Sequence, residues 1–178
     1  MFASTHGDLA ITDYMCATLA DAPAEISPTR FHNSVHNAAA GYWTIGTGCL
    51  RPATAVSAHG ATFAQGLLEA LVQLATGEDA VLLVAYDTPA QGPLGTQARS
   101  EGLLGGALLL SREGVGPVLS ATLADGTAPV ADGPLARHAA ANAMAPMLPL
   151  FDALAAGRRQ VALDAGAGRV LRMEVAHG

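Results

Sequence analysis

The residues with the clearest chemical potential lie at one turn, where Ser57, His59 and Gly60 join a short apolar segment to a long apolar helix. The first turn of a helix has unpaired backbone N–H groups and the positive end of the helix dipole. Anions and nucleophiles are therefore stabilised there. A histidine in this place is a candidate general base, so the turn is the first candidate site.

Ser57 is the nucleophilic hydroxyl at this turn. A serine between a strand and a helix has the location of the nucleophile elbow of α/β-hydrolases. That elbow needs glycine two positions before and two positions after the serine, and Ala55 and His59 occupy these positions. Because no Ser–Asp–His order can be assembled around Ser57, the sequence argues against a hydrolase.

Metal and nucleotide motifs are also incomplete. His32 and His36 are four residues apart, but the zinc-protease motif has Glu directly after the first histidine, and this chain has Asn33. We interpret the pair as hydrogen-bonding histidines at a loop–helix junction. The run from Gly46 to Gly48 lacks the third glycine and the preceding strand of a dinucleotide site. We therefore expect no metal and no cofactor.

Composition restricts the class of protein. The chain has 178 residues, of which 51% are hydrophobic and 13% charged, and its mean hydropathy is +0.32. Its longest apolar run, Leu103 to Leu110, is interrupted by two glycines and falls short of the ~20 residues that span a bilayer. We expect such a chain to bury apolar surface in an oligomer. A net charge of −6, with no basic cluster, argues against nucleic acid as a partner.

Cys16 and Cys49 form no CxxC pair and no disulfide framework, which suits a reducing cytoplasm. No basic segment followed by an apolar one marks a signal peptide at the start. These features predict a cytoplasmic protein.

The elements around the turn follow from hydrophobic patterning. Ala53 to Ala58 reads as a buried strand and Ala61 to Thr76 as a helix with a narrow polar stripe, ended by Gly77. The continuous apolar run Ala80 to Tyr86 predicts a parallel strand covered on both faces. This succession of strand, helix and strand predicts an α/β fold.

The rest of the chain adds helices and hairpins, and the whole predicts one domain over residues 1–178. We expect a mixed sheet packed between helices, with antiparallel hairpins towards the C-terminus. The remaining expected elements are a strand end at Met1 to Thr5, a helix to about Ala20, a helix over Asn33 to Ala40, a loop over Asp87 to Gly102, a hairpin of Leu103 to Ser111 with Val115 to Ala121, a helix over Pro134 to Ala156 interrupted by Pro146 and Pro149, and a hairpin of Gln160 to Asp164 with Arg169 to Val175.

A longer motif covers residues 27–45. It resembles the segment S-P-x-x-F-x-x-S-V-x-N-x-x-A-G-x-x-x-I of β-ketoacyl synthases, which have the thiolase fold. The similarity continues through Arg51 to His59, which looks like the strand leading to the family's active-site turn, and into Ala80 to Tyr86. It covers the N-terminal half of that fold and implies that the family's first strand and helix are missing from this chain. The matching residues are Ser27, Pro28, Phe31, Ser34, Val35, Asn37, Ala40, Gly41 and Ile45.

The group that this chain resembles most is the short chain length factors of aryl polyene and polyketide-like pathways, relatives of fatty acid synthases. In active synthases a cysteine occupies the turn before the buried helix, and here that position is His59. The family's two catalytic histidines and its Gly-Phe-Gly-Gly loop are absent. The resemblance therefore implies no catalytic residue.

The resemblance implies a silent, non-catalytic subunit that pairs with an active β-ketoacyl synthase and works with an acyl carrier protein. Residues near the turn and the preceding helix would shape the partner's acyl tunnel, and the strand before the turn would pair across a two-fold axis in a homo- or heterodimer. The tunnel or turn candidates are Phe31, Ser57, His59, Gly60 and Phe63, with Tyr42 and Trp43 nearby; the interface candidates are Ala53, Thr54, Ala55, Val56 and Ser57.

Two alternatives remain open. One is an enzyme in its own right, an acyl-carrier-dependent decarboxylase or acyltransferase that uses His59 as its base. The other is a remnant that folds only as a homodimer and binds nothing.

Overall fold

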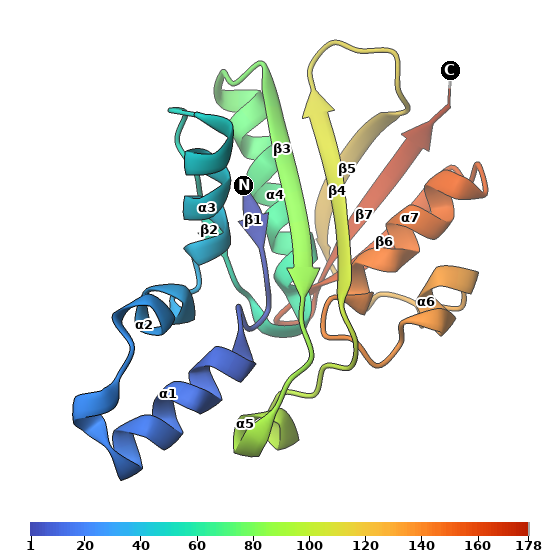
Figure 1. The fold of residues 1–178 in the computed structure, drawn as a ribbon. Helices are drawn as coiled ribbons and strands as arrows, with labels where there is room; N and C mark the ends of the chain where they lie inside the picture. Colours follow the sequence, from blue (N-terminus) through green and yellow to red (C-terminus); the bar gives the residue numbers. More distant parts are fainter. Residues whose placement is uncertain (178) are drawn as a thin grey trace.

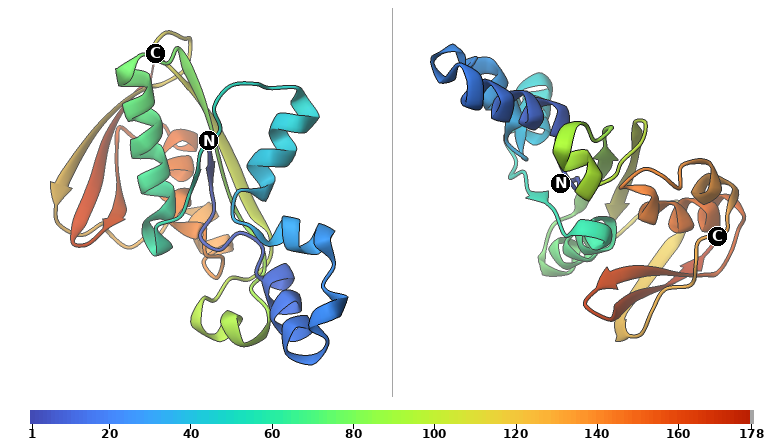
Figure 2. Two further views of the ribbon diagram at one scale, coloured as in Figure 1. Left: turned by 90° about the vertical axis from the view of Figure 1, so that its left-hand side faces the viewer. Right: turned by 90° about the horizontal axis from the view of Figure 1, so that it is seen from below.

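The computed structural model describes residues 1–177. Two β-sheets enclose a layer of helices, and further helices lie outside the first sheet and at one end of it (Figures 1 and 2). The predicted α/β class, with a mixed sheet among helices, is confirmed. We call the two sheets sheet A and sheet B.

Sheet A has the strand order β2-β1-β3-β4. β1, β2 and β3 run parallel, and β4 is antiparallel to β3. The short first strand is central, because Phe2 lies beside both Ala55 and Val84. The strands are β1 (Phe2–Ala3), β2 (Ala55–Val56), β3 (Ala80–Asp87) and β4 (Leu104–Ser111).

Sheet B is antiparallel, in the order β5-β7-β6, with β5 (Val118–Asp125), β6 (Gln160–Gly166) and β7 (Arg169–Ala176). The predicted hairpin of β6 with β7 is confirmed. The predicted hairpin between the strands now seen as β4 and β5 is wrong, because β4 pairs with β3 and the segment 112–117 crosses to the other sheet. Eight cross-strand pairs with the apolar β3 outweigh the local turn signal.

The middle layer consists of α4 (Thr62–Thr76) and α7 (Leu148–Ala155). α4 packs against sheet A so closely that a Cβ on Gly66 would lie 3.1 Å from the Cβ of Ala3. On its other side α4 reaches sheet B, where the Gln65 amide donates to the carbonyl of Ala165 at 2.7 Å. The helix predicted over Ala61 to Thr76 is confirmed within one residue, and Gly77 ends it with a φ of +131°.

The helices outside the middle layer are α1 (Leu9–Asp21), α2 (Pro28–Ser34), α3 (Ala38–Thr47), α5 (Gly92–Gln97) and α6 (Pro134–His138). The predicted helix over Asn33 to Ala40 is wrong, because the chain breaks between α2 and α3, where Val35 is extended. Ser27 caps α2 earlier than expected, and the His36 ring is held by the carbonyl of Ser4 at 2.7 Å. The predicted loop over residues 87–102 contains α5, and Pro149 restarts the chain as α7, as predicted.

The core fills the space between the two sheets. Phe63 of α4 packs on Phe151 of α7, with ring centroids 6.2 Å apart. Met147 lies against Gly106 of β4, where a Cβ would come within 3.1 Å of its methyl carbon. The core includes inward side chains of both sheets that are buried; among them are Leu83, Leu163, Leu171, Met173 and Val175.

Candidate functional site

The turn that joins β2 to α4 lies at the end of sheet A where β1 and β3 also end (Figure 1). His59 begins a short 3-10 turn, His59–Ala61, that leads into α4. Its φ is +53°, in the left-handed region that non-glycine residues rarely adopt. Such strain persists where the surroundings over-determine the backbone, which is common at functional turns. His59 itself is exposed.

The first turn of α4 uses its own N–H groups. The N–H of Ala61 donates to the carbonyl of Ala58 at 3.0 Å, and that of Thr62 to the carbonyl of His59. The Thr62 hydroxyl accepts from the N–H of Ala58 at 2.9 Å and donates to the carbonyl of His59 at 2.7 Å. Sequence reasoning expected free amides at this turn. In the structure, the N–H groups of Ala61 and Thr62 are already bonded within the 3-10 turn, and the N–H of Ala58 is bonded to the Thr62 hydroxyl.

The imidazole of His59 accepts a hydrogen bond from the backbone of the next residue. Its Nδ1 accepts the N–H of Gly60 at 2.9 Å, so a neutral ring carries its proton on Nε2. The nitrogen that a general base would use is therefore already hydrogen-bonded. Within residues 1–177 no carboxylate hydrogen-bonds to this ring, so nothing orients it as in a catalytic dyad.

Ser57 is exposed and its hydroxyl does not bond to His59. Its hydroxyl donates to the carbonyl of Thr5 at 2.9 Å. A nucleophilic serine donates its proton to a base instead. The sequence argument against a hydrolase agrees with this geometry.

Sequence reasoning missed the most highly bonded group at this end of sheet A, the carboxylate of Asp87. It is fully buried and accepts the hydroxyl of Ser4 at 2.8 Å, the N–H of Thr5 at 2.9 and 3.1 Å, and the N–H of His6 at 3.2 Å. Placing Asp87 in an exposed loop was wrong. The sequence did contain a signal for this role, namely an aspartate at the end of a buried apolar strand. A carboxylate buried in that position needs hydrogen-bond donors around it.

Tyr86 precedes Asp87 and lies on the outer side of β3, half-buried. Burial is the main reason that the pKa of Tyr86 lies above its ordinary value. The side chain of Ser4 opposes this shift, and the negative charges of Asp87 and Asp8 add to it.

Neither cysteine is near the turn. Cys49 shares a hollow with Gln73, Thr76 and Gly77, at the opposite end of α4 from His59. A helix of 15 residues is about 22 Å long, so the two ends are far apart. Cys16 lies exposed on α1. The thiols therefore cannot replace a nucleophile at the α4 turn.

The predicted tunnel residues are not gathered around one cavity of this chain. Phe31 on α2 is 60% exposed, whereas Phe63 at the start of α4 is 2% exposed and belongs to the core. Tyr42 and Trp43 lie partly exposed on α3, and Trp43 packs edge-on against Phe2. The exposed members form a surface outside sheet A rather than an enclosed channel.

The prediction of a buried strand over Ala53 to Ala58 is wrong: β2 is only Ala55–Val56, is half-buried, and is the free edge of sheet A. β2 pairs only with β1 among the strands of residues 1–177. The carbonyls of Thr54 and Val56 accept the N–H groups of Phe2 and Ser4, at 2.8 and 3.2 Å. Because bonding groups alternate sides along a strand, Ala55 directs its N–H and C=O to the open edge.

His32 and His36 do not form a metal site. His36 bonds to Ser4, and His32 packs edge-on against Tyr42 with centroids 6.0 Å apart. In the described part of the chain, no three His, Cys, Asp or Glu side chains are grouped to hold a metal ion.

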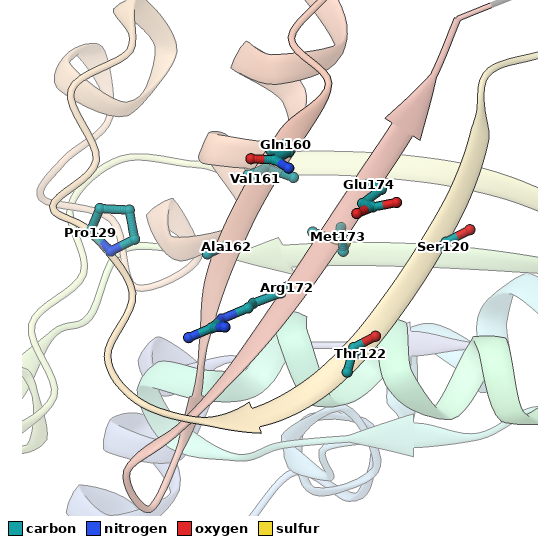
Figure 3. Close-up of a pocket in the computed structure, with 9 residues that line it drawn as sticks. All are labelled: Ser120, Thr122, Pro129, Gln160, Val161, Ala162, Arg172, Met173 and Glu174. Atoms are coloured by element: carbon teal, nitrogen blue, oxygen red, sulfur yellow. The ribbon is translucent and has the colours of Figure 1, made fainter.

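Two hollows lie away from the turn. One, of about 770 Å³, lies on the outer face of sheet B and is lined by Thr122, Arg172 and Glu174 of β5 and β7 and by Pro129 on a loop (Figure 3). The other, of about 700 Å³, lies between α3 and the outer face of sheet A. No helix within residues 1–177 combines the length and apolar character of a membrane span.

Comparisons with known proteins agree on one family. The family described as beta-ketoacyl synthase, N-terminal domain, matches residues 1–169. A chain of the solved structure described as a ketosynthase, ApeO, in complex with its chain length factor, ApeC, from Xenorhabdus doucetiae is 25% identical, with a TM-score of 0.76. The alignment covers 97% of this chain and 67% of that one. No curated protein sequence matches.

Proposed function

Because this chain belongs to the family of β-ketoacyl synthase N-terminal domains, we propose that it is a non-catalytic subunit that pairs with an active β-ketoacyl synthase. The acyl chain would be made on the partner, with an acyl carrier protein as donor. In this role the chain resembles a chain length factor of a polyketide-type or aryl polyene pathway.

The observation that carries this proposal is the α4 turn. Condensation requires a nucleophile that holds the acyl group as a thioester. His59 stands at that position with its Nδ1 bonded to Gly60, and both cysteines lie elsewhere. An imidazole cannot hold an acyl chain as a stable thioester, so this turn lacks the group that the condensation requires.

The β2 edge supports pairing. A strand edge with free N–H and C=O groups readily accepts a strand from another chain. Ala55 offers such groups, and Ala53, Thr54 and Ser57 are exposed beside it. The solved structure similar to this chain contains a ketosynthase with its chain length factor, which favours a heterodimer.

The alternative function, catalysis by His59, has less support. A base needs a free lone pair and an orienting partner. The ring of His59 has its Nδ1 engaged, and no carboxylate of residues 1–177 hydrogen-bonds to it.

Mixing the purified chain with an active, cysteine-bearing β-ketoacyl synthase tests the proposal. We expect a stable 1:1 complex by size-exclusion chromatography and light scattering, and an altered product length in the presence of carrier protein. Ala55→Pro should weaken the complex at least tenfold without changing the melting temperature, because proline removes only the edge N–H. Ala55→Val keeps that N–H and serves as the matched control.

A second experiment tests whether the α4 turn is catalytically inactive. We expect no CO₂ release from malonyl-carrier protein by the chain alone, and no change in the complex's product with His59→Ala. Release that His59→Ala abolishes would make the chain an enzyme. Failure to bind the synthase at micromolar concentration would remove the pairing role.

A further inference from the structure

β4 forms a second free edge of sheet A, on the opposite side of the sheet from β2 (Figure 1). On the neighbouring strand, Val84 donates its N–H to the carbonyl of Met1 in β1 at 2.9 Å, so it does not bond to Ala107, its cross-strand partner on β4. Because bonding groups alternate along a strand, Gly105, Ala107 and Leu109 direct their N–H and C=O groups to the open edge. All three residues are exposed.

The β4 edge also lacks the features that usually protect an edge strand, which are charges, prolines, bulges and short length. β2 has only two residues, β6 has a register shift at Asp164, and β5 ends on Asp125. β4 has eight residues, none of them charged and none a proline, and its pairing with β3 is uninterrupted. Among the edge strands of residues 1–177, β4 is therefore the least protected.

The order of side chains on β4 fits a second copy of the same strand. If two β4 strands run antiparallel with Ala107 opposite Ala107, Gly105 of each copy lies beside Leu109 of the other. Leu109 is 74% exposed, and glycine is the neighbour that leaves the most room for it. The space beside Gly105 is open, because a Cβ there would meet only Ala85 and Tyr86, each at 3.8 Å.

The charges at the two ends of β4 match as well. Arg99 and Glu101 precede the strand, and Arg112 and Glu113 follow it. In the antiparallel arrangement the start of one strand lies beside the end of the other, so each end brings carboxylates of one copy near an arginine of its partner. The pairs that Arg99 and Arg112 make within the chain, with Glu101 and Asp79, are exposed and 3.7 Å long, so little is lost if they exchange partners.

We propose that β4 pairs with β4 of a second copy of this chain, so that two four-stranded sheets join across a two-fold axis. About six backbone hydrogen bonds would form between the strands. One strand edge buries less than a standard interface of about 1,600 Å², so we expect an affinity in the micromolar range. The inference is independent of the proposed pairing function, because the β2 edge stays free for a synthase.

Cysteine cross-linking in a Cys16→Ser, Cys49→Ser background tests the register. Ala107→Cys should give a disulfide-linked dimer on mild oxidation, because the Cα atoms of a hydrogen-bonded antiparallel pair lie about 5.5 Å apart. Gly105→Cys and Leu109→Cys should each stay monomeric alone, since four residues separate each from its own copy, and should cross-link when mixed. A dimer linked by Gly105→Cys alone would contradict this register and overturn the proposal.

Sedimentation equilibrium of the unmodified chain, between roughly 1 and 300 µM, tests the association itself. We expect a monomer–dimer equilibrium that Leu109→Lys weakens at least tenfold, because a charge on an edge strand opposes pairing. Val130→Lys is the matched control, since Val130 is 93% exposed and lies on the loop after β5. Both side chains are exposed, so both variants should fold, as circular dichroism would verify.

Three results would overturn the proposal. One is a monomer over the whole concentration range, and another is equal weakening by Leu109→Lys and Val130→Lys. The third is a dimer that Ala55→Pro abolishes and Leu109→Lys leaves intact, which would place the second copy on β2.

Discussion

Sheet A and sheet B bury the same kind of inner face but carry different outer faces. The outward pairs of β3 and β4 in sheet A include Leu82 with Leu109 and Val84 with Ala107. On sheet B, Ser120 and Glu174 are outward partners. Antiparallel sheets commonly leave one polar face in water, whereas parallel strands are covered on both faces. The outer face of sheet B is therefore polar, as expected for a face in water, whereas the outer face of β3 and β4 is apolar.

The two sheets also differ in the interactions that stabilise their ends. The end of sheet A is fixed by the buried Asp87, which ties β3 to the loop after β1. The end of sheet B has an exposed ion pair, Asp125 with Arg169 at 3.0 Å. Exposed ion pairs contribute about 0–1 kcal/mol, and a buried bonded carboxylate contributes far more.

The largest expected effect is that of Asp87→Ala. The substitution leaves three buried or half-buried donors, from Ser4, Thr5 and His6, without their acceptor. At about 1–3 kcal/mol for each unsatisfied group, we expect a loss of roughly 4 kcal/mol in the free energy of unfolding, measured with urea. Asp125→Ala on sheet B is the control and should lose less than about 1 kcal/mol. Similar losses would remove the contrast between the two ends.

Core truncations should affect the two sheets equally. Leu83 of β3 and Leu171 of β7 are both 0% exposed and face the middle layer. We expect Leu83→Ala and Leu171→Ala each to cost about 2–5 kcal/mol, with the same denaturant dependence. A transition in which one sheet unfolds separately would show that the two do not share one core.

Substitutions that exchange a polar and an apolar side chain between the two outer faces should change dye binding more than the free energy of unfolding. Thr122→Leu puts a leucine on the outer face of sheet B, and Leu109→Thr removes one from sheet A. Surface substitutions of this kind stay within about 0.5 kcal/mol. We expect Leu109→Thr to lower binding of the dye ANS and Thr122→Leu to raise it. Opposite changes in dye binding would contradict the assignment of the faces.

The smallest effect is on pH dependence. Burial raises the pKa of Tyr86 in the folded state, so its contribution to stability is fully present below the unfolded value of about 10 and is lost as pH rises above it. Tyr86→Phe should therefore flatten the fall in melting temperature between pH 9.5 and 11. Tyr14→Phe, on α1, is the control. An unchanged slope in Tyr86→Phe would contradict a role of this hydroxyl.

The sequence allowed the family, the fold class and the α4 turn to be predicted, because these depend on local patterns. A buried helix between Ala61 and Thr76 and a strand over Ala80 to Tyr86 follow from uninterrupted hydrophobicity. The partner of β4 could not be predicted, because strand pairing across distant segments has no local signature. Beside the break at Val35, His36 is hydrogen-bonded to Ser4, 32 residues away, a contact that no local pattern indicates.

The candidate site was only partly accessible for the same reason. The position of His59 followed from the motif, but the bond from Gly60 to its Nδ1 depends on a strained backbone angle that composition does not reveal. Asp87 gained its role from three groups that lie more than 80 residues away. Long-range hydrogen bonds of this kind are visible only in three dimensions.

The central position of β1 also has a consequence for biosynthesis. Its two residues pair with residues 55–56 and 84–85, so the strand has no partner while it leaves the ribosome. At 5–20 residues per second, several seconds pass before residue 85 is made. During that interval Phe2 and its neighbours are available to chaperones, and sheet A is complete only after β4, which ends at Ser111, has been translated.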